Sequence, residues 1–157
     1  MYGGTGSWYF STLAGLRRAP GSRSWSDLVI APPAPGSINN NLTWANASID
    51  TPIGIVRSAW SVAGGAGDAV SHTLHAIVPP NARGRVVIPA VAAALAAAFV
   101  VAEGGSVVWA DGHYAGAVAG IMTATLAEVE GGSGAVVFEV GSGSYVFTSC
   151  CHAAGTT

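Results

Sequence analysis

The sequence predicts a mainly β protein: an antiparallel β-sandwich, jelly-roll-like, preceded by one short N-terminal α-helix. Short apolar runs recur from residue 27 onward and are separated by glycine and proline residues, which is the pattern of a sandwich or a barrel. No helical segments alternate with these runs, so a βαβ fold is not indicated. The length of 157 residues and the hydrophobic content of 50% fit one domain with a buried core.

The helix is expected within residues 1–19. Trp8, Leu13 and Leu16 recur at helical spacing, and Pro20 would end the helix. A short lone helix cannot bury the large aromatic side chains near its start. These side chains are those of Trp8, Tyr9 and Phe10. The cluster therefore predicts a partner for the helix, either the sandwich behind it or a domain that precedes it.

The rest of the chain predicts a sandwich domain over residues 20–150, followed by a tail of residues 151–157. In one expected strand Val56 and Trp60 share a face, because side chains alternate between the two faces of a strand. The alanine run of residues 90–98 has helix propensity, although its position between strands also allows an irregular linker or an insertion. The expected strands cover residues 27–31, 42–50, 53–62, 69–78, 84–88, 107–110, 121–129, 135–140 and 145–148.

Only 9% of the residues are charged, and the formal net charge is −2. All six basic residues are arginines and form no basic stripe with aromatic residues, so nucleic acid is not an expected partner. A surface with so few charges is typical of a domain that packs against a larger partner.

Neither a signal peptide nor a transmembrane helix is expected in this chain. The N-terminus lacks a basic region before its short apolar stretch. The longest apolar run, residues 86–102, contains Pro89, consists largely of alanine and is shorter than the roughly 20 residues of a membrane span. A membrane is therefore not an expected partner, and the sequence assigns no cellular compartment.

The residues that usually carry chemistry are scattered. The eight acidic residues lie at turns and strand ends, without the facing pair of carboxylates that a glycosidase needs. His72 and His75 are three positions apart and would lie on opposite faces of a strand, which disfavours a shared metal. Asp111 and His113 flank a glycine in a turn, but no nucleophile accompanies them. The sequence therefore predicts no catalytic residue, no metal site and no cofactor.

Two further patterns concern carbohydrate, one as a bound ligand and the other as an attached glycan. The side chains of Trp44, Trp60 and Trp109 would either form a sugar-stacking platform or fill the core. Asn41 and Asn46 each begin an N-glycosylation sequon, which matters only if the chain enters a eukaryotic secretory route.

Read in order, several segments resemble the C-terminal end of bacterial and fungal α-L-rhamnosidases, glycoside hydrolase family 78. The N-terminal segment with its aromatic cluster resembles the last helix of the family's (α/α)6 catalytic barrel. Later segments resemble strands of the family's C-terminal sandwich. They are residues 28–32, 42–48, 51–54, 58–60, 78–81, 86–89 and 136–147.

The resemblance implies a parent enzyme that hydrolyses terminal non-reducing α-L-rhamnose with inversion. The family's catalytic acids lie in the barrel, upstream of the stretch that matches this chain, so the resemblance places no catalytic residue at any position here. We therefore expect a non-catalytic module that supports a catalytic barrel, encoded either in the same parent chain or separately, and that is inactive alone. The alternative is a stand-alone carbohydrate-binding module that uses exposed tryptophans.

Overall fold

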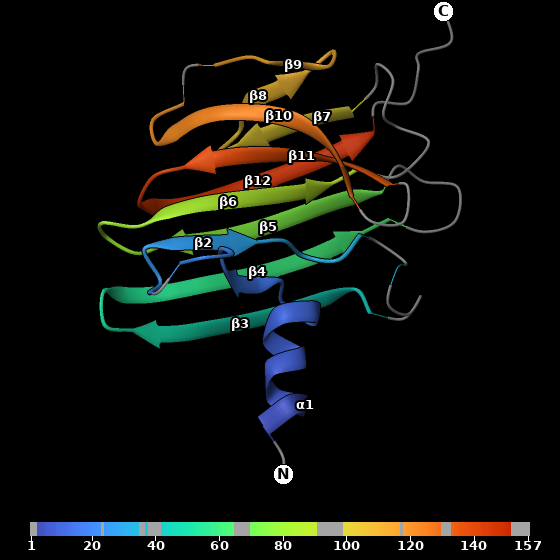
Figure 1. The fold of residues 1–157 in the computed structure, drawn as a ribbon. Coiled ribbons are helices and arrows are strands. Elements are labelled where there is room, and N and C mark those ends of the chain that lie inside the picture. The colour runs from blue at the N-terminus through green and yellow to red at the C-terminus, as the bar shows by residue number, and fades with distance from the viewer. Residues whose placement is uncertain are drawn as a thin grey trace, which may run out of the picture.

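The computed structural model describes residues 3–22, 24–34, 37, 42–64, 70–90, 99–116, 118–129 and 133–151. Two β-sheets lie face to face, and a short helix extends away from one end of the sandwich (Figure 1). Helix α1 (Gly3–Trp8) continues into a π-helical turn, η1 (Tyr9–Leu13). The strands are β1 (Leu16–Arg18), β2 (Asp27–Ile30), β3 (Trp44–Thr51), β4 (Gly54–Ala63), β5 (Ser71–Val78), β6 (Arg83–Pro89), β7 (Phe99–Glu103), β8 (Ser106–Ala110), β9 (His113–Tyr114), β10 (Ile121–Val129), β11 (Ser133–Val140) and β12 (Gly143–Cys151).

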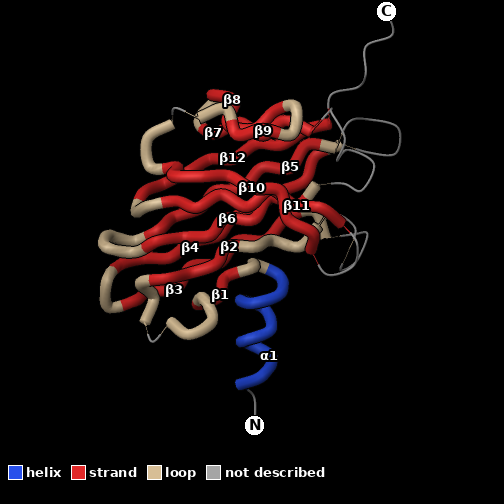
Figure 2. The backbone as a smooth tube through the Cα atoms, turned by 45° about the horizontal axis from the view of Figure 1, so that its top comes forward, coloured by secondary structure: helices blue, strands red, loops and turns tan. Residues whose placement is uncertain are grey.

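One sheet has five strands in the order β1-β2-β6-β11-β10, and the other has seven in the order β3-β4-β5-β12-β7-β8-β9. All neighbours pair antiparallel except β2 and β6, which run parallel. Figure 2 shows α1 beside β1 and β3, which are edge strands of the five-stranded and the seven-stranded sheet. The predicted sandwich is thus confirmed, with one parallel pair that the sequence did not indicate.

The core lies between the two sheets and follows the alternation of the strands. Val56 and Trp60 share a face of β4, as predicted, and this face points inward. At the centre, Phe138 of β11 and Phe147 of β12 pack with ring centroids 5.0 Å apart, which joins the two layers. Both side chains are fully buried. Burying such rings supplies much of the hydrophobic stabilisation of a sandwich.

The helical segment is shorter than predicted. It ends at Leu13, and residues Leu16–Arg18 form strand β1. Gly15 breaks the helix with a left-handed φ of 73°, a conformation that glycine adopts without steric cost. Its carbonyl oxygen accepts a hydrogen bond of 2.9 Å from the N–H of Ala31. Leu16 is then buried against the core as a residue of the five-stranded sheet.

Strands β7 and β9 are absent from the prediction. Strand β7 follows directly on the alanine run, and β9 has only two residues, so neither produces a distinct period in the sequence. Of the alanine run, Ala90 is buried beside β11, while residues 91–98 lie outside the described residues.

Candidate functional site

The aromatic cluster predicted to need a partner is solvent-exposed on α1 and η1. The exposed fractions are 46% for Trp8, 53% for Tyr9 and 38% for Phe10. The rings of Trp8 and Tyr9 meet edge to face with centroids 5.4 Å apart, an arrangement that aromatic pairs prefer. Three large apolar side chains at adjacent positions form an unusual amount of exposed apolar surface, of the kind that marks an interaction site.

The helical segment is fixed to the sandwich at its C-terminal end. The indole Nε1–H of the buried Trp60 donates a hydrogen bond of 2.8 Å to the carbonyl oxygen of Leu13. This carbonyl belongs to the last turn, where helix carbonyls lack intrahelical donors. The next residues, Ala14 and Leu16, are buried in the core. The aromatic cluster is therefore presented by a segment whose base is held in place.

Two grooves flank the base of the helical segment. The first, of about 380 Å³, lies between η1 and residues 45–48 of the edge strand β3, and its helical wall includes Tyr9, Phe10 and Leu13. The second, of about 490 Å³, lies toward β1, and Phe10 lines it as well. A partner that covers the aromatic cluster would thus meet a mainly apolar groove on one side and a mixed polar and apolar groove, which Arg17 and Arg18 help to line, on the other.

The three tryptophans expected to form a sugar-stacking platform do not lie on one exposed face. Trp60 and Trp109 are 4% and 5% exposed because they point into the core between the sheets. Trp44 is 66% exposed on the outer face of β3. Alternation along each strand puts inward and outward residues at every second position, and only the packed sandwich decides which tryptophans are buried.

The two sequon asparagines differ in what the structure describes. Asn46 is exposed on β3, where its Oδ1 accepts a hydrogen bond of 3.3 Å from Nε of Arg57 on the neighbouring β4. Asn41 lies outside the described residues. Glycosylation of either residue stays a prediction.

The histidines of β5 lie on opposite faces, as the strand period predicts. His75 is exposed, whereas His72 is buried and stacks on Trp60 with centroids 6.1 Å apart. Burial lowers the pKa of His72 from 6.5 to about 4, because an apolar site disfavours the charged ring. Among the described residues neither ring nitrogen has a hydrogen-bond partner. The strand pattern separated His72 from His75 but did not predict that His72 is a core residue.

Within the part of the chain that the structure describes, no group of three histidine, cysteine, aspartate or glutamate side chains is arranged to hold a metal ion. The helices described are all too short to cross a membrane. The ion pair between Arg85 and Glu139, at 3.0 Å on the outer face of the five-stranded sheet, is largely exposed.

Comparison with known proteins gives the following relationships. Residues 15–98 match the family described as the bacterial alpha-L-rhamnosidase C-terminal domain. The alpha-L-rhamnosidase from Dictyoglumus thermophilum is similar over 95% of this chain, with 27% identity and a TM-score of 0.68. The native alfa-L-rhamnosidase from Aspergillus terreus is similar over 57% of this chain, with 30% identity and a TM-score of 0.46. No curated protein matches. The matched region spans 14% of the Dictyoglumus enzyme and 9% of the Aspergillus enzyme.

Proposed function

Because this chain belongs to the family of bacterial α-L-rhamnosidase C-terminal domains, we propose that it is a non-catalytic module that supports the catalytic barrel of an α-L-rhamnosidase. The parent enzyme would remove terminal non-reducing α-L-rhamnose from glycosides. The observation that carries the proposal is the exposed cluster of Trp8, Tyr9 and Phe10 on a segment anchored to the sandwich core.

The barrel is the proposed partner because the cluster has the properties of an interface core. Aromatic side chains dominate the binding energy of protein interfaces when they become fully buried. The grooves beside η1 would receive side chains of the partner, and the bond between Trp60 and Leu13 would keep the cluster at a fixed angle to the sandwich. Preorganisation of this kind lowers the entropic cost of docking.

We propose a non-catalytic role because of where the carboxylate side chains lie. The carboxylates Asp27 and Asp50 lie on strands of different sheets, and Asp111 lies in the turn before β9. Glycoside hydrolysis needs two carboxyl groups within roughly 5–10 Å across a sugar-sized space. Both grooves at the helix are lined by residues other than aspartate and glutamate.

The first test is the release of a chromophore from an aryl α-L-rhamnoside. We expect no turnover above the uncatalysed rate by the purified 157-residue chain at any protein concentration. Turnover that follows this chain through purification and disappears with its removal would contradict the proposed non-catalytic role.

The second test places the chain behind a rhamnosidase catalytic barrel in one polypeptide. We expect the fusion to melt at a higher temperature than the barrel alone. Replacing Trp8, Tyr9 and Phe10 together by alanine should remove this gain while leaving the melting temperature of the isolated chain unchanged. The matched control is Leu126→Ala, which truncates an exposed apolar side chain on β10. Equal effects of the triple variant in the fusion and in the isolated chain would contradict docking through the cluster.

The alternative is a stand-alone carbohydrate-binding module that uses exposed tryptophans, and its proposed platform of three tryptophans is reduced to Trp44. Such a platform needs several aromatic faces side by side in solvent, whereas Trp60 and Trp109 are buried. The support function is therefore the better-supported proposal.

A further inference from the structure

Trp44 is the most exposed of the large hydrophobic side chains in the described residues, and its surroundings are polar rather than apolar. It lies at the start of β3 on the outer face of the seven-stranded sheet. The strand register places three hydroxyl residues in one row with Trp44. They are Ser61 of β4, Thr73 of β5 and Thr148 of β12. Neighbouring strands are about 4.8 Å apart. The indole therefore stands at one end of a line of evenly spaced hydroxyl groups.

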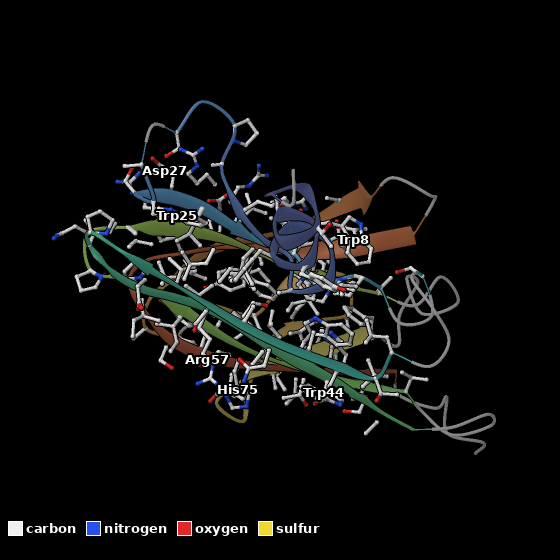
Figure 3. The ribbon with its side chains drawn as sticks, turned by 90° about the horizontal axis from the view of Figure 1, so that it is seen from below. Trp8, Trp25, Asp27, Trp44, Arg57 and His75 are labelled. Atoms are coloured by element: carbon white, nitrogen blue, oxygen red, sulfur yellow. The ribbon has the colours of Figure 1, made fainter. Side chains whose placement is uncertain are left out.

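A second row runs parallel to the first, two residues further along β3. It consists of Asn46, then Ala59 of β4, then His75 of β5. The small side chain of Ala59 makes a low point between an amide and an imidazole. Arg57 adds its guanidinium at the edge of this low point, where its Nε bonds to Asn46 at 3.3 Å. Figure 3 shows Trp44, Arg57 and His75 along the same side of the ribbon.

We propose that this outer face, which we call the Trp44 face, binds a neutral carbohydrate chain. It comprises Trp44, Asn46, Arg57, Ser61, Thr73, His75 and Thr148. The negative face of an exposed indole attracts the polarised C–H groups of a pyranose ring. Amide, imidazole, guanidinium and hydroxyl groups supply both donors and acceptors for sugar hydroxyls. Both rows cross β3, β4 and β5, and the hydrogen bonds between these strands set the spacing of their side chains.

The charges on this face favour a neutral ligand over an anionic one. Arg57 is one cation, and Asp50, which lies on the same side of β3, is one anion. A polyanion would require several cations in a row. Near the centre of this face, Ile77 and Val146 are only partly exposed. The more exposed Ile55 and Val107 lie apart from Trp44, because Ile55 is six residues along β4 from Ser61 and Val107 is on β8, five strands across the sheet. A protein partner would therefore find one aromatic anchor without the apolar core that usually surrounds it.

The Trp44 face goes beyond the proposed support function, because Trp44 lines neither of the grooves beside the aromatic cluster on α1 and η1. The two surfaces share Asn46, which also lines the groove between η1 and β3. Trp44 projects from the outer face of the sheet, whereas Trp8, Tyr9 and Phe10 belong to the helical segment at the edge of the sandwich (Figure 1). The variants keep the two proposals distinguishable, because Trp44→Ala changes the outer face alone and the triple alanine variant changes the aromatic cluster alone.

The test is electrophoresis of the 157-residue chain through native gels that contain arabinogalactan, xyloglucan or galactomannan. We expect at least one of these neutral polysaccharides to retard the chain. Trp44→Ala should weaken this binding about tenfold, and His75→Ala should weaken it less. Leu126→Ala, which changes an exposed side chain on the other sheet, should migrate like the unchanged chain.

Three outcomes would overturn the proposal. The first is the absence of retardation by any of the three polysaccharides. The second is retardation that Trp44→Ala leaves unchanged, or that is seen only in a fourth gel, which contains the anionic polygalacturonate. The third is that Trp44→Ala removes the gain in melting temperature of the fusion while no polysaccharide binds, which would make the Trp44 face part of a protein interface.

Discussion

Trp60 in the core of the sandwich donates its indole N–H to the carbonyl oxygen of Leu13, and this hydrogen bond of 2.8 Å joins the two parts of the molecule. Trp60 is buried between the sheets, and Leu13 ends the helical segment that carries the aromatic cluster. The ring thus both fills the core and satisfies a helix carbonyl. The orientation of the cluster depends on this contact.

Trp60→Phe should separate these two roles. Phenylalanine retains an aromatic ring but has no N–H, so the carbonyl of Leu13 loses its donor. We expect a loss of about 1 kcal/mol in the free energy of unfolding from the hydrogen bond, with a further cost from the smaller ring. Urea denaturation measures the total. Hydrogen exchange should quicken at the amide of Ala14, which donates to Tyr9, and unchanged exchange there would contradict the anchoring role.

His72 should make the protein less stable in mild acid. Its folded-state pKa lies at about 4 and its unfolded value at 6.5. Above the unfolded value both states are neutral. As the pH falls from 6.5 to 4, the unfolded chain takes up a proton that the folded chain does not, so stability is lost. The loss from this group alone approaches about 3 kcal/mol and stops below the folded pKa.

The measurement is urea denaturation at about pH 8 and about pH 5, where His72 should account for about 2 kcal/mol of the difference. His72→Phe should reduce the difference by this amount, because phenylalanine cannot take up a proton. His75→Gln is the matched control, since His75 is exposed on the other face of the same strand. If His72→Phe and His75→Gln showed the same dependence on pH, burial of His72 would not be its origin.

Gly15→Ala should be severely destabilising. A Cβ atom at this position would overlap the backbone oxygen of Ala31, and φ is 73°. Gly116 offers a matched control, because its φ is 74° and no described atom lies within 4 Å of its Cβ position. Gly116→Ala should therefore cost only the conformational term of about 1–2 kcal/mol, and Gly15→Ala several kcal/mol more. Thermal denaturation of both variants measures the difference, and equal costs would show that the chain relieves the clash by a small shift.

Glu139→Gln should change stability little. The pair of Arg85 and Glu139 is 3.0 Å long, but its side chains are about half exposed. Exposed ion pairs contribute at most about 1 kcal/mol and are screened by salt. We expect a change of less than about 1 kcal/mol in urea denaturation, which decreases further at high salt. A larger, salt-independent loss would mean that Glu139 has a structural role beyond the pair.

The sequence alone determined the sandwich, because glycine and proline separate alternating apolar runs that can bury one face only by packing two sheets together. It also predicted that the aromatic cluster needs a partner, either the sandwich or a preceding domain, since three adjacent rings on a short helix exceed what that helix can cover. The folded chain then showed that the sandwich leaves all three rings exposed. The sequence did not determine where the helix ends, because Gly15 and the neighbouring Ala31 meet only in the folded chain.

The tertiary structure decided the roles of individual side chains. Trp44, Trp60 and Trp109 are equivalent as residues, and the packing of the two sheets buries two of them and leaves Trp44 in solvent. The line of hydroxyls beside Trp44 comes from strands that are far apart in the sequence and neighbours in the sheet. Strand order and register are properties of the whole chain, and a local sequence pattern does not determine them.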